Sequence, residues 1–84
     1  MSRRIRISRG VQIDWLAVGR RVRELRGFDM TQQQFADHIG ISQTYLSYME
    51  HGKGEIGAEV LLRISRKFGK SIEWLLTGQE AARQ

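Results

Sequence analysis

Apolar residues recur at helical spacing in several segments of this chain, and each segment is bounded by residues that start or end helices. In the first segment, the apolar residues follow one another at intervals of three or four and are Trp15, Val18, Val22 and Leu25. Such a stripe is the buried face of an amphipathic helix. The spacing predicts a helix over residues 14–26, with Asp14 as its N-cap.

The second and third segments lie on either side of Gly40. Thr31 and Gln34 fit a capping box, which opens a helix that Gly40 ends. Ser42 is the expected N-cap of the next helix, which runs to about Glu50. Two short helices joined by a tight turn form a helix-turn-helix, in which the second helix is the one offered to DNA.

Two more helical segments follow toward the C-terminus. Leu61, Ile64 and Phe68 form an inward stripe over residues 57–68, and a last helix is expected over residues 71–77. Outside the N-terminal arm, no segment alternates apolar and polar residues as a strand does. The pattern therefore predicts an all-α fold, a compact five-helix domain around one core.

The chain of 84 residues is expected to hold one domain, over residues 13–79, between a basic arm of residues 1–12 and a tail of residues 80–84. Its net charge of +5 is unevenly distributed. Residues 1–30 contain eight arginines and three acidic residues, whereas residues 31–84 contain six basic and six acidic ones. A basic arm beside a neutral helical body suits a polyanionic partner, although a merely solvated tail gives the same pattern.

The arm leaves three interpretations open. Arg3 and Arg4 are candidates for contacts with a DNA backbone or a minor groove. Ile5 and Ile7 could instead form an edge strand that pairs with a second subunit. The arm could also be disordered while the protein is free, which we rank first.

Composition excludes several classes of protein. The chain has no cysteine, no apolar run long enough for a membrane span and no secretory signal, so we expect a cytoplasmic protein. His38 and His51 have no carboxylate or thiol at metal-binding spacing, and we place both on the surface. We expect no metal, no cofactor and no catalytic residue. Trp15 and Trp74 are expected to pack in the core.

The helix from Ser42 carries a narrow apolar stripe of Leu46 and Met49, which should anchor it on the core. That anchoring turns its polar residues outward as candidate base readers: Gln43, Thr44, Ser47 and Tyr48. A glutamine suits adenine in a bidentate pair, and a threonine methyl can meet a thymine methyl. Tyr45 fits the DNA edge or the core equally well. The helix starts at Thr31 and Ser42 favour phosphates.

Taken together, three stretches give the chain a family likeness: VGRRVRELR at residues 18–26, MTQQQFADHIGISQTYLSYMEHGKG at 30–54 and LLRISRKFGKSIEWLLTG at 61–78. In their order and spacing they resemble the helix-turn-helix domain of lambdoid phage repressors and of the wider XRE family of bacterial regulators. The resemblance covers most of the chain and implies the lambda-repressor-like five-helix fold.

The resemblance also implies roles for matching residues. Gln32 should contact a phosphate and brace the recognition helix. Further backbone contacts are implied for Ser42, Lys53 and Arg20. Arg26 and Glu50 match the positions of a structural ion pair in many members. One departure is that the recognition helix carries neither lysine nor arginine.

The function expected from these observations is sequence-specific regulation of transcription, as a repressor that binds double-stranded DNA as a homodimer. Leu75, Leu76 or the arm are the candidates for the dimer contact. The alternative is an antitoxin or adaptor that uses the same fold to bind a protein partner such as a toxin. The absence of basic residues on the recognition helix favours this alternative.

Overall fold

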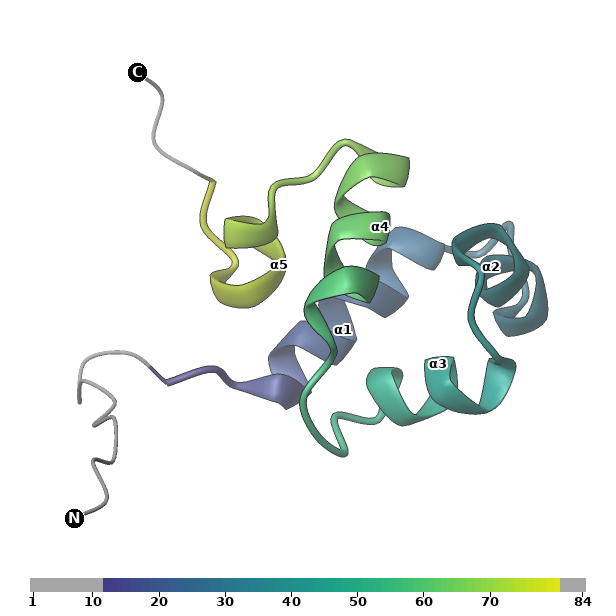
Figure 1. Cartoon of the computed structure of the whole chain (residues 1–84), viewed down its shortest axis with the longest axis horizontal. Helices are drawn as coiled ribbons and strands as arrows, with labels where there is room; N and C mark the ends of the chain where they lie inside the picture. Colours follow the sequence, from purple (N-terminus) through teal and green to yellow (C-terminus); the bar gives the residue numbers. More distant parts are fainter. Residues whose placement is uncertain (1–11, 81–84) are drawn as a thin grey trace, which may run out of the picture.

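The computed structural model describes residues 12–80, which form five helices and no strand. Their order is α1 (Trp15–Arg26), α2 (Gln32–Ile39), α3 (Gln43–Glu50), α4 (Ala58–Phe68) and α5 (Ile72–Thr77) (Figure 1). Every helix lies within a residue or two of its predicted position. The arm residues Arg3 and Arg4 and the possible strand at 4–8 lie outside the described residues.

Side-chain caps explain where four of the five helices begin. Thr31 and Gln34 form the predicted capping box, in which the Thr31 hydroxyl accepts from Gln34 N at 3.1 Å. In return, Gln34 Oε1 accepts from Thr31 N at 2.9 Å. Single side-chain caps are made by Asp14, Ser42 and Ser71. The exception is α4, which begins after Gly57 without a side-chain cap.

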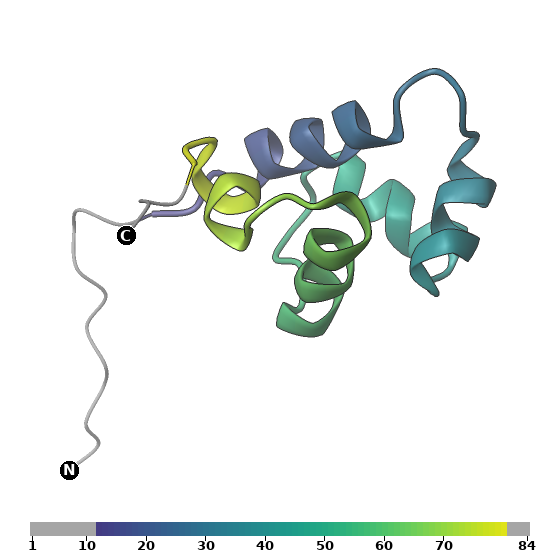
Figure 2. The same cartoon turned by 90° about the horizontal axis from the view of Figure 1, so that it is seen from above.

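The helices enclose one apolar core. α1 packs on α3 and α5, α2 packs on α3 and α4, and α4 packs on α5. α2 and α5 lie at opposite ends of the molecule with α1 and α4 between them, as the view from above also shows (Figures 1 and 2). The largest fully buried side chains are Phe35, Leu46, Met49, Ile64, Leu75, Val18 and Val22. The rings of Phe35 and Phe68 stack with centroids 5.2 Å apart, which joins α2 to α4.

Trp15 and Trp74 are only partly buried and pack against the core from its edge. Leu75 corrects one expectation. It is fully buried and therefore cannot supply the dimer contact for which we considered it. α5 has only six residues, and its most buried position is directed at the core, where Arg21 Nη1 donates to the Leu75 carbonyl at 2.9 Å. Leu76 remains partly exposed.

Candidate nucleic-acid interface

The turn between α2 and α3 is fixed by hydrogen bonds from both sides. Gly40 adopts the left-handed conformation, with φ 86° and ψ 36°, which only glycine adopts without strain. The amides of Gly40 and Ile41 both donate to the Ala36 carbonyl, at 2.8 and 2.9 Å. From α4, Arg63 Nη1 donates to the carbonyls of Ile39 and Gly40 at 3.2 and 3.1 Å. Backbone hydrogen bonds and the Arg63 side chain therefore fix the turn between α2 and α3 together.

A close approach between α1 and α3 holds the other end of the recognition helix. Gly19 is buried in α1, and a Cβ atom at this position would collide with the main-chain oxygen of Met49. The same Cβ would lie 3.0 Å from the main-chain oxygen of Glu50. Only glycine lets the two backbones meet here. No local pattern in the sequence marks this residue, because a glycine inside a helix does not indicate what it faces.

An ion pair connects the ends of α1 and α3. Arg26 Nε and Nη2 donate to the two carboxylate oxygens of Glu50 at 2.8 and 3.0 Å. The Glu50 side chain is 3% exposed and that of Arg26 15%, so the pair is shielded from solvent. Its bidentate geometry is the strong form of this contact. The pair implied by the family resemblance is thus present.

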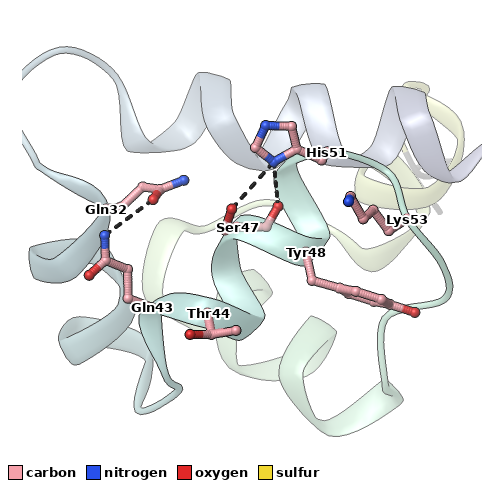
Figure 3. A pocket seen from close by; sticks show the side chains of 7 residues that line it. All are labelled: Gln32, Gln43, Thr44, Ser47, Tyr48, His51 and Lys53. Carbon is pink, nitrogen blue, oxygen red and sulfur yellow. Dashed lines mark hydrogen bonds between the residues drawn. The ribbon is translucent and has the colours of Figure 1, made fainter.

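Gln32 extends this pair into a chain of polar contacts that reaches the surface. Its Nε2 donates to Glu50 Oε1 at 2.9 Å, and its Oε1 accepts from Gln43 Nε2 at 3.3 Å (Figure 3). Gln32 therefore braces α3 from the start of α2. The side chain of Gln43, the first residue of α3, is tied through Gln32 to the buried charge of Glu50.

The pair also sets the ionisation of Glu50. Burial alone raises the pKa of this carboxyl group, but hydrogen bonds from Arg26 and Gln32 and the charges of Arg26 and Arg23 outweigh it. The net effect lowers the pKa of Glu50. The hydrogen bond to Glu50 raises the pKa of Arg26 despite partial desolvation. Both groups are therefore charged at neutral pH.

Beside the polar contacts of Gln32, α3 forms one wall of an open groove (Figure 3). Seven residues line it: Gln32, Gln43, Thr44, Ser47, Tyr48, His51 and Lys53. The structure thus gathers all four predicted base readers in one place, together with Gln32 and Lys53. Gln43 and Thr44 are exposed at the N-terminal end of α3, and Ser47 is half-buried one turn later. None of the seven residues carries a carboxylate.

Two tyrosines on α3 stack on each other, with ring centroids 5.8 Å apart. Tyr48 is 38% exposed, and its hydroxyl lies so close to Gly54 that a Cβ there would collide with it. Tyr45 is partly buried, and its hydroxyl accepts from Gly57 N at 3.2 Å. Tyr45 thus belongs with the core and the loop before α4, while Tyr48 faces the groove.

His51 was expected only as a surface residue, and it lines the groove. It forms the C-cap of α3, and its ring Nδ1 lies 2.8 Å from the Ser47 carbonyl oxygen (Figure 3). His51 lies four residues after Ser47, the spacing of neighbours on a helix, but it follows the last residue of α3 and no sequence pattern indicates that its ring turns into the groove.

The remaining predicted residues lie outside the groove lining. The hydroxyls of Thr31 and Ser42 cap α2 and α3. Arg20 is exposed on α1 and lines a second hollow near Arg23 and the fully exposed Phe28. Within residues 12–80, no cluster of three acidic, histidine or cysteine residues could hold a metal ion, and no helix is long and apolar enough to cross a membrane.

A short exposed helix, held against two others by a fixed turn and a buried ion pair, defines a helix-turn-helix protein of the DNA-binding class. Residues 20–75 match the family model described as "Helix-turn-helix". The chain belongs to this family, in the XRE type of DNA-binding helix-turn-helix regulators.

Two curated regulators are similar in sequence. The propionyl-CoA carboxylase regulator of Cereibacter sphaeroides is 35% identical over 65 residues, which are 76% of this chain and 14% of that protein. The HTH-type transcriptional activator BcrR of Enterococcus faecalis is 39% identical over 61 residues, 71% of this chain and 30% of that protein. The chain thus spans less than a third of the length of either relative.

Solved structures share the fold. The P22 c2 repressor in complex with a synthetic operator superposes with a TM-score of 0.67 at 27% identity, and the match covers 82% of this chain and all of the repressor chain. The restriction-modification controller protein C.AhdI of Aeromonas hydrophila gives a TM-score of 0.66 at 23% identity over 75% of this chain and 97% of its own. At that identity the second match shows the fold alone.

Proposed function

We propose that this chain is a sequence-specific regulator that inserts α3 into the major groove of DNA and acts as a homodimeric repressor. The observation that carries the proposal is the groove beside α3. It brings four hydrogen-bonding side chains of one short helix to the surface, and a buried ion pair holds that helix in place. Within the protein, these exposed polar groups have few partners of their own.

Base reading is assigned to Gln43, Thr44, Ser47 and Tyr48. Gln43 and Thr44 are exposed at the N-terminal end of α3, which is the end that reaches base edges in helix-turn-helix proteins. The contact with Gln32 restricts the Gln43 amide before DNA arrives. A restricted amide loses less conformational freedom on binding, and a bidentate pair with adenine discriminates by about 1–3 kcal/mol.

Backbone contacts are assigned to groups at the edges of the groove. The N-termini of α2 and α3, at Thr31 and Ser42, offer amide groups to phosphates. Gln32 lies at the start of α2, and Lys53 supplies a cation beyond the end of α3. Arg20 on α1, with Arg3 and Arg4 of the arm, would add further cations. Affinity then arises mainly outside α3, while α3 selects the sequence.

The homodimer follows from how such domains read DNA. Two recognition helices on a pseudo-palindrome must lie about 34 Å apart to meet successive major-groove faces. The P22 c2 repressor, which shares the fold, was solved with an operator, and this supports repression. BcrR, by contrast, is a transcriptional activator. Since relatives include both a repressor and an activator, the proposal that α3 reads bases does not depend on the proposal that this chain represses transcription.

Selection of bound duplexes from a random pool tests the function. We expect enrichment of a pseudo-palindrome whose half-sites are about one helical turn apart. A second candidate function is a protein-interaction module such as an antitoxin, favoured by the absence of lysine and arginine on α3. No enrichment, with binding weaker than the non-specific range of about 10⁻⁴–10⁻⁶ M, would favour that candidate.

A further inference from the structure

His51 occupies a place in the groove that the assigned DNA contacts do not use. Its main-chain amide donates to Ser47 O at 3.0 Å and closes the last turn of α3. Its ring folds back onto the same residue, with Nδ1 2.8 Å from the Ser47 carbonyl oxygen and 3.4 Å from the Ser47 hydroxyl (Figure 3). The other ring nitrogen, Nε2, makes no hydrogen bond to any residue from 12 to 80.

The contact with the Ser47 carbonyl assigns the tautomer of the ring. A carbonyl oxygen only accepts hydrogen bonds, so a nitrogen at 2.8 Å from it must carry the hydrogen. The opposite tautomer would leave a lone pair on Nδ1 facing the lone pairs of that oxygen. A hydrogen bond from the Ser47 hydroxyl, at the longer distance of 3.4 Å, would not offset this repulsion. The neutral ring therefore has its hydrogen on Nδ1 and a bare lone pair on Nε2.

This tautomer has a consequence for any anion that approaches the groove. A neutral His51 offers only a lone pair at Nε2, which repels a phosphate oxygen. A protonated His51 offers an N–H group and a positive charge at the same atom, which together make a charge-assisted hydrogen bond. We propose that His51 binds a DNA phosphate through Nε2 only after it takes up a proton, so that DNA binding by this groove is linked to pH. This inference rests on the proposed function.

The position of His51 favours a phosphate over a base as its partner. Base edges are met by the N-terminal end of α3, whereas His51 follows the last residue of the helix. Lys53, a cation suited to the DNA backbone, lines the same part of the groove. A phosphate that comes close favours the charged ring in turn, so that phosphate binding and proton uptake support each other.

Other charged groups lie on the elements around the end of α3, so the test has to separate their effect on DNA binding from that of His51. Guanidinium, ammonium and phenol groups titrate above about pH 9, carboxylates below about pH 5, and imidazoles in between. Titratable or charged groups on the neighbouring elements include Arg20, Arg23, Glu24 and Arg26 on α1, Tyr48 and Glu50 on α3, and Lys53 in the loop that follows. His38 is the other histidine of the chain, and it lies on α2 against Phe68, outside the groove lining.

The test measures the affinity of the full chain for two labelled duplexes, one of random sequence and one enriched by selection, from about pH 8 to about pH 5.5 at constant ionic strength. We expect the wild-type Kd to fall by about tenfold, the effect of one charge-assisted hydrogen bond. His51→Asn keeps a donor for the Ser47 carbonyl but loses Nε2, and its Kd should stay at the high-pH value. His38→Asn is the matched control and should behave as the wild type.

The remaining outcomes overturn the inference. If the wild-type Kd did not change with pH, or if His51→Asn kept the pH dependence of Kd, DNA binding would not be linked to a proton on His51. Binding that weakens as pH falls would mean that neutral Nε2 accepts from a base. Imidazole ¹⁵N chemical shifts of the free protein at about pH 8.5 should show the hydrogen on Nδ1, and the other tautomer would contradict the argument. If selection enriches a duplex and the profile is flat, this inference fails while the proposed function stands.

Discussion

The Glu50 carboxylate at the end of α3 receives two hydrogen bonds from Arg26 at the end of α1, at 2.8 and 3.0 Å. A third hydrogen bond comes from Gln32 at the start of α2. One buried carboxylate thus ties three helices together, and the last residue of α3 is fixed relative to both of its neighbours. The recognition helix owes its orientation to this contact as well as to its two apolar anchors.

Arg26→Met should destabilise the fold strongly. It leaves the Glu50 charge buried with Gln32 as its main remaining partner, and removal of one member of a buried pair costs about 3–5 kcal/mol. Urea unfolding measures this loss in the free energy of unfolding. Glu59→Gln is the matched control, because it breaks the exposed pair with Arg63 and should cost at most about 1 kcal/mol. Equal losses in the two variants would show that burial of the first pair has no energetic importance.

Acid should weaken the fold through Glu50. Because the pKa of Glu50 is lower in the folded protein than in the unfolded chain, its contribution to the free energy of unfolding is complete above the unfolded carboxyl pKa of about 4.3. That contribution is lost as the pH falls through the lower folded pKa. The difference in unfolding free energy between wild type and Glu50→Gln should therefore be constant from about pH 7 to about pH 5 and shrink below about pH 4. A difference that grows toward low pH would contradict the sign of this shift.

Gly19→Ala should destabilise the protein although alanine is the better helix former. The added methyl group collides with the backbone of α3 at Met49, and overpacking of this kind costs about 1–3 kcal/mol. Thermal unfolding followed by circular dichroism measures the change. Glu24→Ala, at an exposed position of the same helix, should change stability by less than about 0.5 kcal/mol. An unchanged or raised melting temperature for Gly19→Ala would show that α1 and α3 can separate at no cost.

Local signals in the sequence account for the helices. Thr31, Ser42 and Ser71 are residues whose side chains can satisfy free amides, and the structure uses each as a cap. Apolar spacing likewise identified the buried faces of α1, α3 and α4, whereas in the six-residue α5 it did not single out the buried Leu75. These features depend on neighbours within a few residues, so a single sequence is enough to recognise them.

The contacts that complete the site depend on residues far apart in the chain. Gly19 meets Met49, Arg21 bonds to the Leu75 carbonyl, and no spacing rule predicts such pairs. The contact of His51 with Ser47 is local by comparison, but its place in the groove beside Gln32 depends on how α2 and α3 pack. The likeness to a known family, not periodicity, implied the Arg26–Glu50 pair. Tertiary packing, which local patterns do not encode, decides this part of the site.

Backbone contacts should appear in the salt dependence of DNA binding. The DNA-binding constant falls as salt rises, and Lys53→Gln should make the slope of log K against log salt shallower by about 0.9, the value of one phosphate contact. The same relation applies to Arg20→Gln. Lys67→Gln is the control, since Lys67 is an exposed lysine on α4 outside the groove lining and should leave the slope unchanged. A slope that is the same in Lys53→Gln and the wild type would remove Lys53 from the interface.

The central claim is that α3 selects the DNA sequence through Gln43. Its most direct test compares wild type with Gln43→Ala on the enriched duplex and on duplexes with single base-pair changes. We expect the variant to lose about 1–3 kcal/mol on the enriched duplex and to stop discriminating at one position in each half-site. Gln33→Ala, which removes an exposed α2 amide bonded to Asp37, should keep the full discrimination. If Gln43→Ala weakened binding to every duplex equally, α3 would not be reading bases at this residue.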